Sequence, residues 1–442
     1  MGTDQVEFHL QPESHTQKQL LYAFCLALVA LLLLRDVGGV NLTKWVFVSL
    51  SALAFITLNM RNTAVWLCFI IPLMTGLPNT YLFAAGLIIY VVKNIDRLVI
   101  KNYILVLVAI FLLELASFMY GYFRMTDYIG FLAPLLLISL IIFSDQDDWD
   151  YEKMGLFFVF GAVGAGLSIA WQFIQVNGMD TLIASGVRLG DTNVLLVTEG
   201  MRVSFDPNSF GVLSAVAICV VLVLLRRNTY SKIILAALMV FIIFIGSLTL
   251  SRLFAILIGI IILVYVITST RSLRRFLAGM AVITITALAV YGLINNYSPS
   301  LIESYASRFA VTDVTAGRAG ITAEYFQVLE QHPERLLLGV GLQKYPKKYE
   351  LNFTSHNGTQ EVLITWGVAG LILVSLFIFL IFKYGRRETA KEDWDILYLL
   401  PLITILVGVQ TLPFFYAGNA EMYLLPAYAA MRLVKYEGRL IR

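Results

Sequence analysis

The sequence predicts an all-α, polytopic membrane protein, and its composition gives the main reasons. Hydrophobic residues make up 59% of the 442 residues, the mean hydropathy is +0.80, and only 14% of the residues are charged. Soluble domains carry about 25% charged residues. Because the deficit extends along the whole chain, it indicates many membrane spans and argues against one large soluble core. The net charge of +3 is too small to indicate a nucleic-acid partner.

Apolar segments of membrane-spanning length recur along the chain and predict fourteen transmembrane helices. They lie at residues 18–35, 43–60, 62–77, 80–92, 102–122, 127–143, 153–176, 206–226, 230–249, 251–269, 273–294, 357–383, 394–413 and 418–435. Pro72 and Pro78 interrupt the third and fourth segments. The polar residues 1–17 lack a basic region and a cleavage site, so we expect a tail before an uncleaved first span.

The basic residues of the short loops predict the orientation of these spans. If the N-terminus is cytoplasmic, the loops on the cytoplasmic side are rich in Lys and Arg and the short outer loops are nearly free of them, as the positive-inside rule requires. The inner basic residues are Lys93, Arg97, Lys101, Arg226, Arg227, Lys232, Arg271, Arg274, Arg275, Arg386, Arg387, Lys391, Arg432, Lys435, Arg439 and Arg442. We therefore expect both termini in the cytoplasm.

This topology divides the chain into a bundle at 18–294, a large outer loop at 295–356, and C-terminal helices with a cytoplasmic tail at 357–442. A shorter outer loop lies near 177–205. Connections this long in a compact protein are usually functional. Within the large loop, Ile321, Tyr325 and Val328 recur at helical spacing until Pro333, which predicts an amphipathic helix lying over the outer membrane face.

The cysteines and acids of the sequence do not predict a metal site. Cys25, Cys68 and Cys219 fall inside apolar runs without metal-like spacing, so we expect small buried residues and no disulfide framework. The acidic run 145–148 lies in a predicted inner loop and is expected to be a solvated surface. The spans are almost empty of charge, and Glu114 is the main exception.

Arginines on the predicted outer face are the main candidates for a binding site, because the positive-inside rule disfavours them there. Guanidinium groups suit a phosphate-bearing ligand presented from the membrane. The outer cationic and imidazole residues are Arg188, Arg202, Arg252, Arg308, Arg318, Arg335, His332 and His356. The alternative is that the arginines only pair with outer acids, which are Asp191, Glu199, Glu303 and Glu324.

Two short outer stretches surround these arginines. Asp206 and Pro207 are typical of a helix start, and Arg202 would lie above its positive end, where an anion can also bind. Residues 249–252 form a tight turn between two apolar spans and bring Arg252 to its edge. An interfacial arginine that reaches back to water is the alternative interpretation of Arg252.

A third stretch, Ser355-His356-Asn357, leads into the apolar run that begins near Val362. His356 would lie at the outer N-terminus of a membrane helix. The positive end of the helix dipole disfavours the imidazolium form, so we expect a largely neutral His356 that can accept a proton. The alternative is a structural histidine that only makes hydrogen bonds.

Taken in order, these stretches resemble the O-antigen polymerase and O-antigen ligase superfamily of membrane glycosyltransferases. The similarity covers residues 200–375 and combines a large outer loop with a set of short motifs. They are Asp206-Pro207-Asn208, Ser251-Arg252, Ala316-Gly317-Arg318, Leu338-Gly339-Val340-Gly341, His356-Asn357 with Glu361, and Trp366-Gly367-Val368-Ala369-Gly370.

The resemblance implies a GT-C-like fold and a metal-independent, inverting glycosyltransferase that needs no cofactor. The donor would be a glycan on undecaprenyl diphosphate at the periplasmic or extracellular face of a bacterial inner membrane. The implied catalytic residues are His356 and Arg318. The residues implied to bind the diphosphate are Arg202, Arg252, Arg308, Asn208 and Asn357.

Three functions fit the sequence to different degrees. A polysaccharide polymerase, which can work with a chain-length regulator, is preferred, and a ligase that transfers the finished glycan to a lipid A-core or protein acceptor is the first alternative. A lipid-linked glycan transporter is the alternative of another class. It needs polar groups at the membrane midplane, for which the sequence offers mainly Glu114.

Overall fold

The computed structural model describes residues 14–98, 102–116, 125–144, 149–178, 188–190, 206–269, parts of 270–297, 298–310, 318–342, 351, 355–386, 396–415 and 420–433. All regular secondary structure in these residues is helical, so the predicted all-α class is confirmed. The α-helices are α1 (His15–Asp36), α2 (Lys44–Thr57), α3 (Met60–Ile70), α4 (Asn79–Lys93), α5 (Tyr103–Ala116), α6 (Met125–Ile142), α7 (Tyr151–Asn177), α9 (Pro207–Arg227), α10 (Lys232–Leu248), α11 (Arg252–Ser269), α13 (Pro299–Phe309), α14 (Arg318–Gln331), α16 (Gly358–Gly385), α17 (Leu400–Gly408) and α18 (Leu424–Arg432). Short 3₁₀ helices are η1 (Ile71–Gly76), η2 (Ile95–Arg97), η4 (Pro333–Arg335), η5 (Ile396–Leu399) and η6 (Ala420–Tyr423).

Helices coincide with the predicted spans wherever those spans are described. Within the described part of the chain, five helices are long and apolar enough to cross a membrane, namely α1, α6, α7, α9 and α16, and six apolar helices are shorter. The candidate 273–294 is described only in part, and the total of fourteen spans stays a prediction. Pro72 marks the change from α3 to the 3₁₀ helix η1, and Pro78 directly precedes α4.

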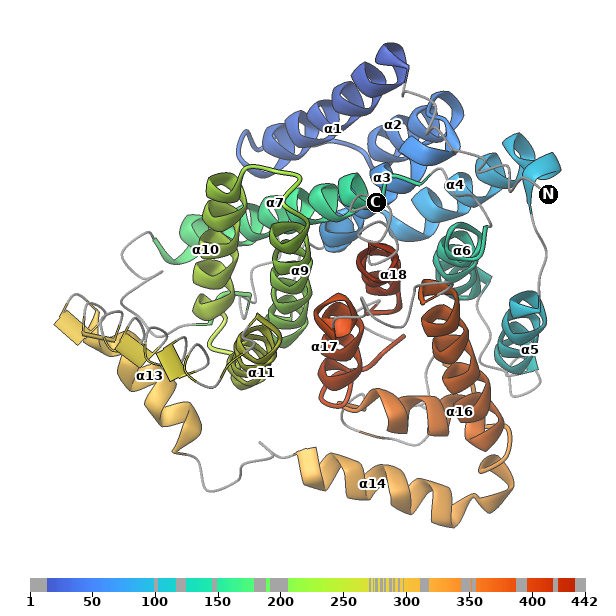
Figure 1. Ribbon diagram of the computed structural model, residues 1–442. Helices are drawn as coiled ribbons and strands as arrows, with labels where there is room; N and C mark the ends of the chain where they lie inside the picture. Colours follow the sequence, from blue (N-terminus) through green and yellow to red (C-terminus); the bar gives the residue numbers. More distant parts are fainter. Residues whose placement is uncertain are drawn as a thin grey trace, which may run out of the picture.

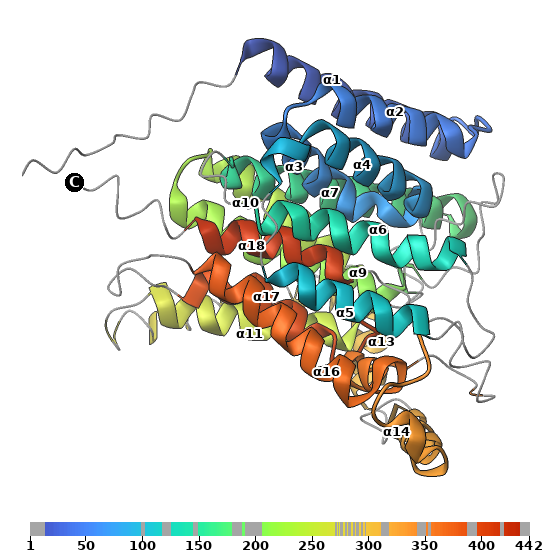
Figure 2. The ribbon, with the colours of Figure 1, turned by 90° about the vertical axis from the view of Figure 1, so that its right-hand side faces the viewer.

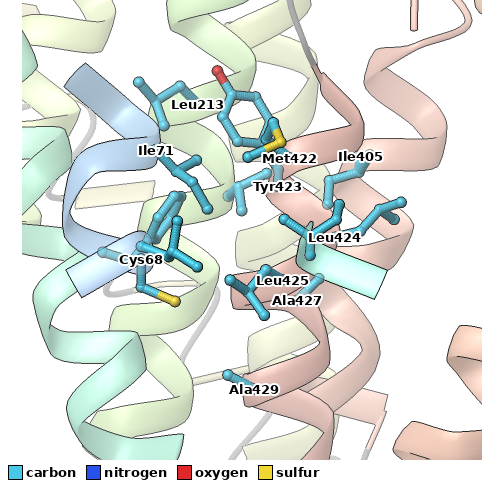
Figure 3. Packing of buried hydrophobic residues seen from close by; sticks show 14 of the residues in the cluster. Cys68, Ile71, Leu213, Ile405, Met422, Tyr423, Leu424, Leu425, Ala427 and Ala429 are labelled. Carbon is cyan, nitrogen blue, oxygen red and sulfur yellow. The ribbon is translucent and has the colours of Figure 1, made fainter. Parts of the chain in front are cut away.

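Helix α9 lies at the centre of the bundle and packs against α7, α10, α11 and α17 (Figure 1). Nearly all of its side chains from Phe210 to Leu224 are buried, as expected for a helix that is apolar on every side. The close view in Figure 3 shows Leu213 of α9, Ile71 of η1 and Leu424 of α18 within one group of packed apolar side chains. The three cysteines are free and buried, which confirms the prediction for them.

The two ends of the bundle differ in their polar contacts. At the N-terminal end of α7, Arg61 pairs with Asp150 at 3.0 Å and Arg227 pairs with Glu152 at 3.2 Å. The C-terminal end of α7, a helix of 27 residues, is about 40 Å away at 1.5 Å per residue. We call that second end, which also carries α14 (Figure 2), the loop end; the sequence predicts that it faces outward.

Helix α16 covers the predicted span 357–383 but is bent, which the sequence analysis did not predict. Gly367 has a left-handed backbone (φ 64°) inside the helix and separates it into two segments (Figure 1). Leu336 and Leu337, just after η4, supply carbonyl oxygens to the N–H groups of Val368 and Ala369 at 2.8 and 3.2 Å. These two carbonyl oxygens therefore accept hydrogen bonds from backbone N–H groups that the bend leaves without partners inside the helix.

The glycine turn at residues 339–341 fits against the same bend. The N–H groups of Val340 and Gly341 donate to the carbonyl oxygen of Thr365 at 2.9 and 2.8 Å. Gly339 also has a left-handed backbone (φ 68°), and a Cβ atom there would lie 2.3 Å from the Thr365 backbone. Only glycine allows the two chain segments to approach this closely.

Helix α14 begins at Arg318 and ends before Pro333, so the predicted loop helix is confirmed. A helix that rests on a membrane would expose its apolar face to lipid. The apolar face of α14 is instead covered by other parts of the chain. Tyr325 and Val328 are buried against Val340 and Ile364. The apolar side chains that the sequence places on one face therefore fix α14 to the first segment of α16.

Two buried carboxylates hold the same region together. Glu114 of α5 accepts hydrogen bonds from the N–H of Leu342 at 2.6 Å and from the indole N–H of Trp366 at 2.8 Å. Glu361 in the first turn of α16 accepts from the N–H groups of Phe414 and Phe415, the second at 3.1 Å. Both carboxylates thus bind donors from distant parts of the chain, which stabilises the bend and the turn against it.

Replacing Gly367 with Ala should destabilise the loop end. A Cβ atom at Gly367 would lie 2.3 Å from the Leu337 backbone, and the left-handed conformation alone costs a non-glycine residue about 1–2 kcal/mol. The matched control is Gly259→Ala in α11, where a Cβ atom meets nothing within 4 Å. Thermal unfolding in detergent should show a lower transition temperature for Gly367→Ala only. Equal transition temperatures for both variants would contradict the proposed role of this bend.

Candidate functional site

Side chains from four separate segments of the loop end lie near enough to interact electrostatically. They are Asp206 before α9, Arg252 at the start of α11, Arg318 at the start of α14, and His356 before α16. Arg318 interacts electrostatically with Arg252 and Asp206, and His356 interacts with Arg318 and Asp206. We call these four residues the arginine–histidine cluster. Three of them are residues that the sequence analysis singled out for the site.

The start of α9 brings Asp206 to the cluster. Its carboxylate accepts hydrogen bonds from the N–H groups of Asn208 and Ser209, both at 2.9 Å, and Pro207 occupies the first turn. The predicted N-cap is therefore confirmed. Both hydrogen bonds of the cap go to one carboxylate oxygen, Oδ1. Asp206 is exposed, so its negative charge lies at the start of the helix.

The turn between α10 and α11 is held against α9. Leu250 has a left-handed backbone (φ 49°), which is rare for a branched residue and makes the turn tight. Ser251 Oγ donates to Asn208 Oδ1 at 2.9 Å. Arg188 donates to the same oxygen at 3.2 Å and to the carbonyl of Thr249 at 3.1 Å. These bonds hold the turn in place, and they thereby fix the position of Arg252, the first residue of α11, in the cluster.

Two further residues support the site: Arg188, which the sequence analysis named only as one of the outer arginines suited to a phosphate, and Gln360, to which it gave no role. Gln360 is buried, and its Nε2 donates to the carbonyl of Thr322 in α14 at 3.0 Å. Its own N–H donates to the Oδ1 of Asn357 at 3.0 Å. A glutamine three residues after an Asn cap is the sequence signal that could have identified it. Gln360 thus joins the helix that begins with Arg318 to the helix that follows His356.

Both asparagines predicted to bind diphosphate have structural partners. Asn357 caps α16 through Oδ1, and its Nδ2 donates to the carbonyl of Gln410 at 3.1 Å. Asn208 accepts from Ser251 and Arg188. These bonds position the neighbouring arginine and histidine, so we assign the asparagines to the support of the cluster. A ligand bound by Asn357 would compete with its bonds to Gln360 and Gln410, whereas the side-chain bonds of Asn208 use only its Oδ1, and direct binding of the diphosphate stays a prediction.

His356 is half-buried, and its Nδ1 atom is buried without a hydrogen-bond partner among the described residues. Burial lowers the pKa of His356 below its ordinary value, and the positive charge of Arg318 lowers the pKa further, while Asp206 opposes both effects. The lowered pKa favours a neutral imidazole, as the sequence predicts. The pKa is lowered by burial and by Arg318, however, and not by the helix dipole alone.

Arg318 remains a cation in a crowded electrostatic environment. Burial lowers the pKa of its guanidinium and so does Arg252, while Asp206 raises it. Arginine nevertheless keeps its proton in proteins. Among the described residues Arg318 forms no salt bridge, in contrast to Arg335, which lies 3.6 Å from Glu334. Arg252 and Arg318 are near enough to affect each other's charge, with Asp206 as a carboxylate near Arg318 in the described part of the chain, and guanidinium groups of this kind suit an anion.

The other candidate residues of the sequence analysis do not join the cluster in the described part of the chain. Arg202 lies outside the described residues, as does the side chain of Arg308 in α13. His332 lies 3.4 Å from Glu334 on an exposed surface. In the described part of the chain, no three His, Cys, Asp or Glu side chains form a group that could hold a metal ion.

Comparisons with known proteins do not identify the chain. No family model matches it, and no curated protein is significantly similar to it. Its function must therefore be inferred from the chemistry of the arginine–histidine cluster and from the apolar helices around it.

Proposed function

We propose that this protein is a membrane glycosyltransferase that polymerises polysaccharide on the outer face of a bacterial inner membrane. In this proposal it transfers a glycan from undecaprenyl diphosphate to a lipid-linked repeat unit. The observation that carries the proposal is that Arg318 lies near enough to interact electrostatically with both Arg252 and His356, at one end of a bundle of apolar helices. In this proposal a phosphate-bearing lipid presents its head group beside these residues.

The two arginines suit the donor side of the reaction. When the bond between the anomeric carbon and the diphosphate oxygen breaks, the electron pair leaves with the diphosphate and negative charge develops there. Arg252 and Arg318, already held in place, stabilise that charge without rearranging. Asp206 offsets part of the repulsion between the two cations, which lets them remain close before the donor binds.

His356 suits the acceptor side. The acceptor hydroxyl attacks the anomeric carbon from the face opposite the diphosphate, and its proton passes to the imidazole. Because burial and Arg318 keep the imidazole neutral, it is able to accept that proton at physiological pH. One direct displacement of this kind inverts the configuration at the anomeric carbon.

The donor chemistry is the same for a polymerase and for a ligase, so only the acceptor separates them. A transporter is disfavoured by the position of Glu114, the main acid within the spans. Its carboxylate holds Leu342 and Trp366, as a structural acceptor does. We therefore retain the ligase as the second candidate and place the transporter third.

The first prediction concerns the catalytic pair. In proteoliposomes supplied with a lipid-linked repeat unit, His356→Ala should slow product formation by about 10²–10⁴-fold, and Arg318→Ala by about 10²–10³-fold. Arg335→Ala is the matched control, since Arg335 lies on the same loop beside Glu334 and outside the cluster. It should remain near the activity of the unsubstituted chain.

The products of the same assay distinguish the candidates. A ladder of chain lengths indicates a polymerase, and a single transfer to a foreign acceptor indicates a ligase. Normal product formation by His356→Ala, with intact insertion in the membrane, would refute a mechanism in which this imidazole accepts the proton of the acceptor hydroxyl.

The second prediction concerns the charge of His356, measured by NMR of histidine-labelled protein. The chain has four histidines, and a His356→Gln variant assigns the signal. Arg318→Gln removes a positive neighbour, so the midpoint of the His356 titration should rise. Asp206→Asn removes a negative neighbour and keeps a good N-cap, so the midpoint should fall. Shifts in the same direction would show that these residues do not surround His356 as described.

The third prediction separates enzyme from proton-coupled carrier through Glu114. Glu114→Gln retains an oxygen that can accept from Leu342 and Trp366, whereas Glu114→Ala does not. Polymer formation should survive the first change and decline with the second, in parallel with thermal stability. If Glu114→Gln abolished activity in a fully stable protein, a proton-carrying role would replace the structural one.

A further inference from the structure

Three consecutive leucines at the loop end lie on the surface. Leu336, Leu337 and Leu338 are 45%, 63% and 50% exposed, although each is a large apolar side chain. We call this segment the leucine turn. Single exposed leucines need no explanation, but a contiguous group on an ordered backbone indicates contact with an apolar partner.

The backbone of the leucine turn is fixed to α16. The carbonyl oxygens of Leu336 and Leu337 accept from Val368 and Ala369, directly after the bend. Glu114 at the end of α5 holds Leu342. The leucine side chains therefore extend from a rigid support beside the first turn of the second segment of α16 and near the end of α5.

That support carries two exposed apolar stripes. On α16 the stripe consists of Val368, Ile372, Leu376 and Phe379; on the neighbouring α5 it consists of Leu105, Val108, Leu112 and Leu115. Both stripes repeat at intervals of three and four residues, as one face of a helix does. In a membrane protein such a face contacts lipid, and the leucine turn continues it toward the loop end.

The length of α16 supplies an independent reason for an apolar continuation. From Val368 to Phe382 the second segment has 15 residues, and exposed Lys383 follows. At 1.5 Å per residue these residues span about 22 Å, which is less than the roughly 30 Å of a bilayer's hydrocarbon core. Another apolar element must cover the rest of that thickness beyond Val368, and the leucine turn lies there.

We propose that the leucine turn is immersed in the hydrocarbon of the lipid leaflet at the loop end and anchors the loop to the bilayer. The backbone of the turn can lie at that depth because its carbonyl groups bond to α16. Through η4 the turn is continuous with α14, so its depth in the membrane affects the height of Arg318, the cluster residue that α14 carries. The anchoring does not depend on the reaction that the cluster catalyses.

Fluorescence quenching tests this anchoring directly. An environment-sensitive dye is attached by maleimide chemistry to Leu337→Cys or Leu338→Cys, and each protein is placed in vesicles of phosphatidylcholine and phosphatidylglycerol with brominated acyl chains. Ile372→Cys serves as the lipid-facing reference, and Glu334→Cys, 57% exposed and two residues before the turn, as the aqueous reference. The unsubstituted chain is the labelling blank, since its three cysteines are buried.

Dyes at Leu337→Cys and Leu338→Cys should be quenched by brominated lipid nearly as much as the dye at Ile372→Cys and protected from aqueous iodide. The dye at Glu334→Cys should show the opposite pattern. Quenching of both turn positions by iodide and not by lipid would overturn the proposal. Disulfide-linked dimers at Leu337→Cys would likewise overturn it, because a second copy of the chain would then cover the turn.

Discussion

The bend in α16 is the constraint on which the arrangement of the loop end depends. A left-handed residue inside a helix leaves backbone groups without their usual partners, and an apolar environment makes such groups costly. The segment from Leu336 to Gly341 supplies the missing partners. Once that segment is fixed to α16, α14 has to lie against the first segment of the same helix, and Arg318 is brought toward His356.

The electrostatics of the cluster follow from this packing. Two guanidinium groups and an imidazole would repel one another if all were charged, and burial strengthens that repulsion. The imidazole loses its charge because it has the lowest intrinsic proton affinity of the three, and Asp206 moderates the remaining positive potential. The result is a positively charged cluster that also holds a neutral imidazole, which is the combination that the proposed transfer from a lipid diphosphate would use.

Patterns that act over a few residues could be predicted from the sequence. Apolar runs gave the helices, Asp206 with Pro207 gave the start of α9, and the spacing of Tyr325 and Val328 gave α14. The bend at Gly367 was missed because its stabilising partners lie about 30 residues earlier in the chain. The roles of Arg188 and Gln360 were missed for the same reason, since each acts through a carbonyl group of a distant segment.

An experimental map of the protein with undecaprenyl diphosphate bound in a lipid nanodisc would test the site most directly. We expect density for the diphosphate between Arg252 and Arg318, with His356 facing the position of the transferred sugar. Density for the diphosphate at the opposite end of the bundle, beside Arg227 and Glu152, would contradict the assignment. So would a map in which α14 lies apart from α16, with Arg318 remote from His356.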